Sequence, residues 1–501
     1  MLSPKQAEQI KPVIKRALEN IIFIEREQDA DTKFKAISPL AEGADTIFAR
    51  VAIEVGIPLE IVLPFERSKY LEGFSSDKER REFEVIYNQV LKEHRRELNT
   101  LNGKEANDLF LALGVEMVNS TDYLIAIWNE KNGKGKGGTE DTVTYAMKNK
   151  KNLLLINPEE EHPRINYLHH DHKESYKAEG VVYPPETNHL ASFIIRKQDE
   201  FDDDAVVYNN KYRKLWTIGF VAGLIEVLAF SLNTTLKPEL PFNFILATVE
   251  FLCLMFIISL VIFGNSKALH RKYVHYRIIS ERLRIKRFFC ELGYRIYETT
   301  VSPIYFSLKA KPEFVILDNT IKLINLSAFS YWPFEQKKEH LEKELILNQQ
   351  HYHERKEVKF KKRNNLYKKI RTLLFLMVAL GIMLHYVKDA NEFFHHLGVH
   401  LSSFWPSFFD THAFEEATLF VSLFIPPTIA ACEALKYLYE WEKIITLSAA
   451  MSAYFSGKAQ KLKRIRTEAE LEDFLNSINR DMLVENLDWE KYMHDKNEVP
   501  T

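Results

Sequence analysis

The chain has 501 residues, of which 46% are hydrophobic and 27% are charged, and its formal net charge is −2. This composition excludes a disordered chain, a collagen-like fibre and a globally basic nucleic-acid-binding protein, and the length suffices for roughly three domains. Three cysteines are too few for a disulfide framework or a four-cysteine zinc site, which fits a reducing compartment. The first residues contain no apolar stretch of secretory length, so we expect no cleavable signal peptide and a cytoplasmic N-terminal domain.

The N-terminal third alternates helical patterns with short apolar runs. A helix is predicted over 3–20, with Ser3 as its N-cap and Pro4 in its first turn. Strands are predicted at the apolar runs 33–38, 59–63, 123–128 and 152–156, and helices at 44–55, 80–98, 106–118 and 139–149. This alternation is typical of an α/β fold with a parallel sheet. The polar stretch 158–188 contains several histidines, but a solvated connection is favoured there over a metal site.

Two pairs of long apolar segments follow, at 215–232 and 242–264, and at 372–387 and 417–435. A segment of about 20 apolar residues spans the hydrocarbon of a bilayer. Lys and Arg concentrate at the outer ends of each pair, and little positive charge lies between its members. The positive-inside rule therefore predicts two hairpins, four transmembrane helices in all, with both chain termini on the cytoplasmic side.

The membrane half reads as an internal repeat, because a basic amphipathic helix follows each hairpin, at 267–290 and at 437–462. A long charged helix is predicted over 334–371 and a final amphipathic helix over 467–492. The aromatic loop before the fourth span, which includes Phe393 and Trp405, is typical of an interfacial belt. The expected domains are 1–195, 196–300, 301–360 and 361–501.

Three turns after predicted strands are candidate ligand contacts. In the first, a small-residue turn opens a helix and suits a phosphate or a ribose hydroxyl, although Asp45 can equally cap the helix; its candidates are Leu40, Gly43, Ala44, Asp45 and Arg50. The second is glycine-rich and lets the backbone approach an anion, or is simply a flexible turn; its candidates are Lys136, Gly137, Gly138, Thr139 and Glu140. Thr139 can cap the helix that follows. The third turn offers Pro64 and Tyr70. Turns at one edge of one sheet can face a single crevice.

The spans carry three carboxylates, Glu226, Glu250 and Glu433, each costly in hydrocarbon. One interpretation is that they line a cation-attracting pore in an oligomer. The other is that they pair with polar or basic groups between helices.

The residues of the N-terminal third resemble the SLOG domains, Rossmann-like sensors related to the LOG nucleotide-processing enzymes. The matching motifs are Ser38 to Asp45, Leu63-Pro64-Phe65 with Tyr70 and Phe74, Asp122 to Trp128, and Gly137-Gly138-Thr139. The membrane half resembles SLATT modules, the two-span effectors found with such sensors, through Tyr276 to Arg287, Tyr352-His353 and Glu485 to Trp489. The family's usual first strand has no counterpart before Ser3, and Thr142 stands where the LOG motif has Glu, so binding is favoured over hydrolysis.

The resemblance implies an α/β Rossmann-like sensor joined to an all-α membrane domain in the bacterial inner membrane. The implied function is an antiphage effector whose sensor binds a nucleotide-derived second messenger, cyclic ADP-ribose-like or a cyclic oligonucleotide, and gates an oligomeric pore or depolarisation. The expected partners are that messenger, the lipid bilayer, other copies of the chain and a messenger-producing enzyme encoded nearby; no nucleic acid, metal or cofactor is expected. The alternatives are a membrane-tethered nucleotide or ADP-ribose hydrolase using Glu42, Asp45 or Glu140 as general base, and a constitutive channel or scaffold.

Overall fold

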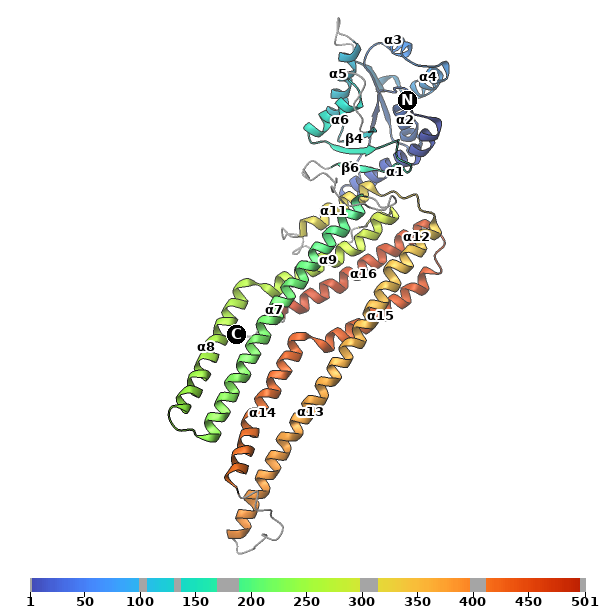
Figure 1. The fold of residues 1–501 in the computed structure, drawn as a ribbon. Helices are drawn as coiled ribbons and strands as arrows, with labels where there is room; N and C mark the ends of the chain where they lie inside the picture. Colours follow the sequence, from blue (N-terminus) through green and yellow to red (C-terminus); the bar gives the residue numbers. More distant parts are fainter. Residues whose placement is uncertain are drawn as a thin grey trace. The chain divides into compact units, whose positions relative to one another are not determined.

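The computed structural model describes residues 2–98, 106–129, 137–168, 189–297, 314–396 and 411–495 (Figure 1). It is mostly helical, with two small sheets in the N-terminal region. Its residues form two compact units that interleave along the chain. The first unit combines Met1–Glu200, Ile279–Lys337 and Thr467–Lys491, and the second combines Phe201–Ile278, Lys338–Arg466 and Tyr492–Thr501. The four predicted domain limits stay a prediction.

The chain opens with helix α1, Pro4–Gln28, which confirms the predicted helix and extends it. Its N-terminus has a capping box: the Gln6 N–H donates to Ser3 Oγ at 3.3 Å, and the Ser3 N–H donates to Gln6 Oε1 at 2.9 Å. Such a cap stabilises a helix by about 1 kcal/mol. One face of α1 is fully buried and includes Ile10, Val13 and Ile14.

The described strands form two three-stranded sheets. In the first, β1 (Ala36–Ser38), β2 (Leu59–Leu63) and β3 (Arg95–Glu97) are parallel, in that order. In the second, β4 (Tyr123–Ile127) pairs in parallel with β5 (Asn152–Ile156), which pairs antiparallel with β6 (Asn166–Leu168). The prediction of one parallel sheet is therefore wrong: within the described ranges β1 and β4 are both edge strands, each hydrogen-bonded to a neighbour on one side only.

The described parts of the connections between these strands are helical, namely α2 (Ala44–Val55), α3 (Arg67–Glu72), α4 (Asp77–Gln89), η1 (Lys92–His94), α5 (Ala106–Asn119) and α6 (Thr139–Lys148). Helix α5 covers both sheets, since Leu113 packs with Ile37 of β1 and Val118 packs with Leu124 of β4. The helix predicted over 80–98 ends early, at Gln89. The Arg95 guanidinium donates from Nε to the Val90 carbonyl at 2.8 Å, and β3 begins at Arg95.

Helices from later in the chain complete the first unit: the second half of α9 (Leu269–Leu292), α11 (Val315–Ser327), the start of α12 (Phe334–His340) and most of α16 (Glu468–Asp495). The predicted apolar face of α16 is confirmed as buried, at Leu471, Phe474, Leu475 and Ile478. Glu472 of α16 accepts the Arg295 N–H at 2.7 Å and lies 4.0 Å from Nη2 of Arg16 on α1. Asn20 of α1 donates to the Leu326 carbonyl at 3.2 Å.

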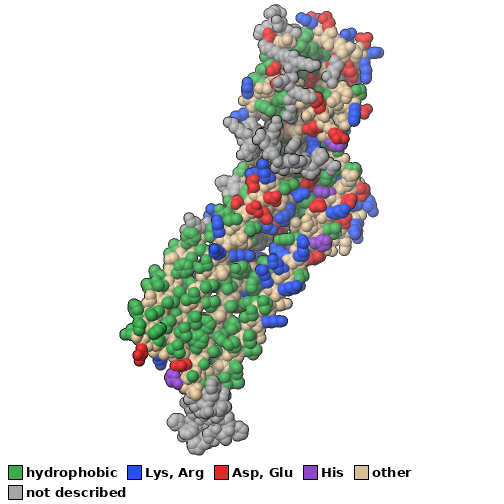
Figure 2. All heavy atoms as spheres, in the orientation of Figure 1, with side chains coloured by type: hydrophobic (Ala, Val, Ile, Leu, Met, Phe, Trp, Pro, Cys, Tyr) green, Lys and Arg blue, Asp and Glu red, His purple; other side chains and the backbone are tan. Residues whose placement is uncertain are grey.

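The second unit is built from α7 (His189–Leu236), α8 (Phe242–Lys267), a π-helical segment η3 (Leu341–Leu347), α13 (Asn348–His396), α14 (His412–Tyr439) and α15 (Trp441–Leu462), with the first half of α9. Among the described residues, four helical stretches are long and apolar enough to cross a membrane, within Leu190–Leu236, Phe242–Leu292, Phe334–Ala390 and His412–Leu462. At most 17% of the residues in their most apolar windows are buried. Figure 2 shows the resulting band of exposed hydrophobic side chains, with Lys and Arg gathered at its end. Such a surface suits contact with lipid.

Candidate functional site

The turn between β1 and α2 holds a constrained backbone. Leu40 is fully buried and has a φ of 51°, and Gly43 has a φ of 97°. The Leu40 N–H donates to Ser38 Oγ at 3.1 Å, and the Ser38 hydroxyl donates to the Asp45 carbonyl at 3.2 Å. A non-glycine residue with positive φ costs about 1–2 kcal/mol and persists only where its surroundings hold it. The turn therefore fixes where the first residues of α2 lie.

Asp45 and Tyr70 form the polar centre of this region. Burial raises the pKa of the Asp45 carboxyl to about 6, against the opposing effect of a hydrogen bond from the Ala41 backbone. The Tyr70 side chain is 5% exposed, and its hydroxyl is buried with no hydrogen-bond partner in the described part of the chain. Burial, and next the charge of Asp45, raise the pKa of Tyr70. A buried unpaired hydroxyl costs about 1–3 kcal/mol, so a ligand that bonded to it would recover part of that cost.

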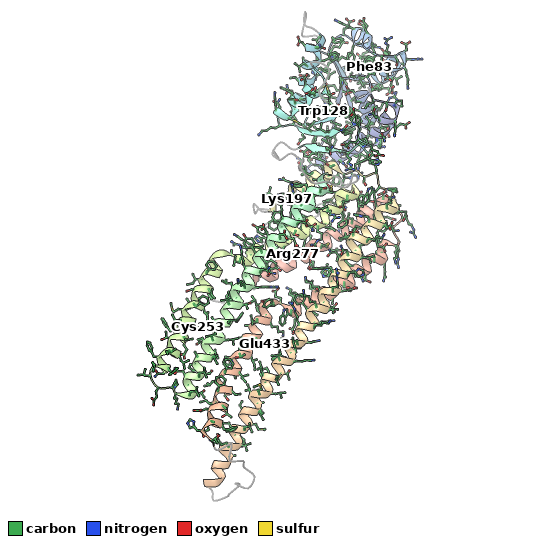
Figure 3. The ribbon with its side chains drawn as sticks, viewed as in Figure 1. Phe83, Trp128, Lys197, Cys253, Arg277 and Glu433 are labelled. Carbon is green, nitrogen blue, oxygen red and sulfur yellow. The ribbon has the colours of Figure 1, made fainter. Side chains whose placement is uncertain are left out.

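Aromatic rings surround Tyr70. Its ring centroid lies 5.8 Å from that of Phe65, 5.6 Å from Phe74 and 6.4 Å from Phe110 on α5. Phe83, labelled in Figure 3, lies 6.1 Å from Tyr70 and is fully buried. Phe74 and Phe83 are buried and Phe65 and Phe110 are half-buried, so the rings against which a planar group could stack are Phe65 and Phe110.

The glycine turn before α6 packs on helix α5. Gly137 has a φ of 89°, and a Cβ there would lie 2.7 Å from the Leu111 nitrogen and 2.8 Å from Phe110 Cβ. The glycine turn and the turn after β2 therefore both approach Phe110, whose ring also lies 5.8 Å from that of Phe65. That these turns form one ligand crevice stays a prediction. The Gly137 N–H donates to Asp141 Oδ2 at 2.7 Å. A carboxylate of the chain itself therefore holds the amide that the sequence assigned to a ligand phosphate.

Several other predicted residues have different surroundings. Arg50 forms an ion pair with Glu82 at 2.5 Å, and Glu42 accepts the Ser75 N–H at 3.0 Å. Gly138, not Thr139, is the N-cap of α6, and it provides no side-chain cap. Pro64 is buried directly after β2, Gly43 and Ala44 are half-buried at the start of α2, and Glu140 lies in the first turn of α6. Lys136 lies outside the described residues.

Sequence reasoning missed Phe110 and Asp141. Asp141 could have been predicted, since a carboxylate in the first turn of a helix commonly accepts hydrogen bonds from nearby backbone amides. Phe110 had none, because its role depends on α5 lying across both sheets. No group of three or more metal-ligating side chains occurs in the part of the chain that the structure describes.

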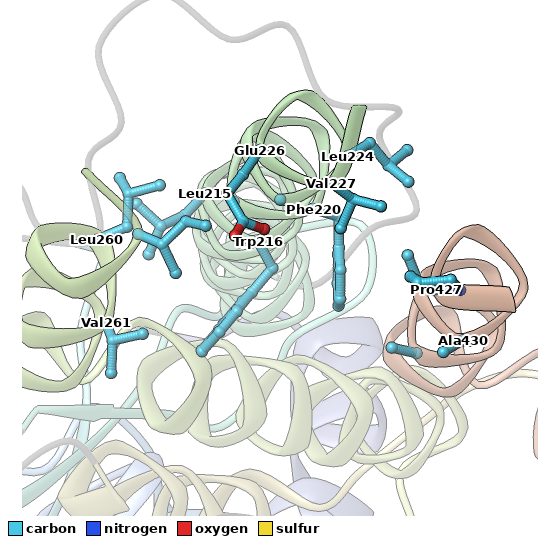
Figure 4. A pocket seen from close by; sticks show the side chains of 15 residues that line it. Leu215, Trp216, Phe220, Leu224, Glu226, Val227, Leu260, Val261, Pro427 and Ala430 are labelled. Carbon is cyan, nitrogen blue, oxygen red and sulfur yellow. The ribbon is translucent and has the colours of Figure 1, made fainter. Parts of the chain in front are cut away.

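The three membrane carboxylates have different environments. Glu433, labelled in Figure 3, pairs with Arg371 of α13 at 2.8 Å and lies 3.9 Å from Lys436, as in the pairing interpretation. Glu250 has a buried Oε1 with no hydrogen-bond partner among the described residues. Glu226 lines a cavity beside Trp216 (Figure 4). The predicted aromatic belt lies almost entirely outside the described residues, apart from the exposed Phe393.

The structure thus establishes four apolar helices of membrane-spanning length and, in the N-terminal region, two small sheets whose turns meet at an aromatic cluster. The resemblance to SLOG and SLATT modules stays a prediction from motifs. No protein-family model, no curated protein and no solved structure matches this chain.

Proposed function

We propose that the chain is a ligand-gated membrane effector, in which a nucleotide-derived messenger binds at Asp45 and Tyr70 and changes the state of the apolar helices. The observation that carries the proposal is an unpaired buried hydroxyl beside a buried carboxyl and aromatic rings, in the same chain as four helices of spanning length. The motif resemblance adds the Rossmann-like sensor, the bacterial inner membrane and the antiphage role, with cyclic ADP-ribose or a cyclic oligonucleotide as messenger.

The chemistry of the site suits the neutral parts of a nucleotide. The Asp45 carboxylate can accept hydrogen bonds from a ribose diol or an exocyclic amine, and the Tyr70 hydroxyl can donate or accept one more. Stacking of a base on an aromatic ring contributes about 1–3 kcal/mol. A phosphate at the glycine turn would have to displace Asp141 from the Gly137 amide. The expected messenger is therefore recognised mainly through its base and sugar.

The chain passes from the first unit to the second within α7, since residues 189–200 are assigned to the first and 201–236 to the second. A ligand shifts such a system only by its difference in affinity for two states, and a shift from 1:99 to 99:1 needs about 5.5 kcal/mol. In an oligomer, several bound subunits would add their contributions to this shift.

Depolarisation of proteoliposomes tests the proposal. The full-length protein is reconstituted with a potassium gradient, and a voltage-sensitive dye reports the response to cyclic ADP-ribose and to cyclic di-AMP. We expect one of them to depolarise vesicles with wild-type protein, and Tyr70→Phe to weaken the response at least tenfold, because it removes only the unpaired hydroxyl. The control is Asp77→Asn, at a side chain 81% exposed. A full response from both Tyr70→Phe and Asp45→Asn would refute the site.

A membrane-tethered hydrolase is the second candidate, because a pKa of about 6 is suited to a general acid or base near neutral pH. In this alternative Asp45 activates a water that attacks the bound nucleotide derivative. The two candidates differ in what happens to the ligand. Chromatography of either messenger after long incubation with the full-length protein recovers it intact if the protein is a sensor, and finds product if it is an enzyme.

A further inference from the structure

A cavity of about 380 Å³ lies among the spanning helices of the second unit. Helices α7, α8 and α14 contribute its walls, with Trp216 and Glu226 from α7, Leu260 from α8 and Pro427 and Ala430 from α14 (Figure 4). Its volume lies at the lower end of the range of about 300–1,000 Å³ that small-molecule sites occupy. Helices α7 and α8 pack closely beside the cavity, because a Cβ at Gly264 of α8 would lie 2.9 Å from Leu215 Cδ2 of α7.

Glu226 is the one ionisable side chain among the described residues that line this cavity. A carboxylate within a membrane span costs several kcal/mol unless a positive charge accompanies it. Two aromatic side chains, Trp216 and Phe220, line the same space, and the face of an aromatic ring attracts a cation. All of these features favour positive charge.

The remaining wall decides which kind of cation fits. Calcium and magnesium take six or more oxygen ligands, and the lining offers a single carboxylate amid apolar and small side chains. An organic ammonium or phosphonium with apolar substituents suits both the single carboxylate and the apolar lining. Its charge would face Glu226, and its substituents would lie against Leu260, Pro427 and Ala430.

We propose that the cavity between α7, α8 and α14 is a binding site for a lipophilic organic cation, with Glu226 as its counter-charge and Trp216 and Phe220 as its aromatic walls. The occupant reaches both apolar hairpins at once, because α7 and α8 belong to one and α14 to the other. This site is separate from the messenger site and does not depend on the proposed gating.

Equilibrium dialysis of the full-length protein in detergent tests the proposal with two probes of matched shape and opposite charge, tetraphenylphosphonium and tetraphenylborate. Protein-free micelles give the background. We expect wild type to bind the phosphonium at least tenfold more tightly than the borate, and Glu226→Gln to lose about tenfold in phosphonium affinity alone. Ala430→Phe should weaken both probes by filling the cavity. The matched control is Glu250→Gln, which removes a carboxylate of α8 that does not line the cavity.

A second measurement leaves the carboxylate unchanged. Phosphonium should quench the fluorescence of Trp216, taken as the difference between wild type and Trp216→Phe, over the same concentrations as the dialysis shows binding. Equal phosphonium affinity of wild type and Glu226→Gln, equal binding of the two probes, or quenching that Trp216→Phe does not reduce would each overturn the proposal.

Discussion

Replacement of Asp45 by Asn should make the ligand-free protein more stable at neutral pH. The carboxyl has a pKa of about 6 in the folded protein, against an ordinary value of 3.8, because burial disfavours its charged form. Between those two pH values the folded state keeps a proton that the unfolded state has lost, so folding stability falls as the pH rises through this window. The amide that Asp45→Asn introduces carries no charge at any pH and can still accept the Ala41 N–H.

The size of the effect follows from the two pKa values. At about 1.4 kcal/mol for each pKa unit, the change from 3.8 to about 6 corresponds to about 3 kcal/mol at pH 8. About half of this remains at pH 5, and almost none remains at about pH 3, where the carboxyl is mostly neutral in both states. The stabilisation by Asp45→Asn should therefore grow with pH, which a general packing effect would not do.

Hydrogen–deuterium exchange of the full-length protein in detergent measures this region locally. Peptides covering 36–55 report β1 and α2, and their rates are corrected for intrinsic exchange at each pH. At pH 8 we expect exchange about a hundredfold slower in Asp45→Asn than in wild type, and a smaller difference at pH 5. Asp77→Asn, at an exposed side chain, should change neither. A benefit independent of pH, or no benefit, would show that the Asp45 carboxyl is not destabilised by burial.

Two further substitutions probe packing by the same exchange measurement. Gly137→Ala should destabilise α5 and α6 by more than Gly43→Ala destabilises α2. Both glycines have a positive φ, but only a Cβ at Gly137 would meet backbone, at 2.7 Å from the Leu111 nitrogen. Equal effects of the two substitutions would contradict the close approach of Gly137 to α5. Glu472→Ala should cost about 2 kcal/mol and speed exchange in α1 and α16, because it removes the acceptor of the Arg295 N–H and the carboxylate that lies near the guanidinium groups of Arg16 and Arg295. Unchanged exchange would show that this contact does not hold α16.

Strong local patterns predicted most elements of the fold. The strand prediction 59–63 coincides with β2 and the prediction 152–156 with β5, because each is an apolar run bounded by turn residues. Strand β3 was not predictable in this way, since Arg95-Arg96-Glu97 carries no apolar pattern and pairs only at the edge of its sheet. The antiparallel β6 has only three residues.

The candidate site was predictable as three turns and not as a set of contacts. Its turns were located because glycines and small residues follow apolar runs. The partnership of Asp45 with Tyr70 depends on burial, which the sequence does not show for a single carboxyl. Position 137 requires a glycine because its turn approaches the backbone of α5 closely, which the sequence does not show. Three-dimensional packing decided both points.

The division of the first unit into three separate stretches of chain has a consequence for biosynthesis. Residues up to Glu200 leave the ribosome first, yet the unit also needs Ile279–Lys337 and, at its C-terminal end, Thr467–Lys491. Both apolar hairpins lie between these stretches and are translated before the last of them. The carboxylate of Glu472 reaches Arg16 only after both apolar hairpins have been translated. The first unit is therefore begun before the two hairpins and completed after them.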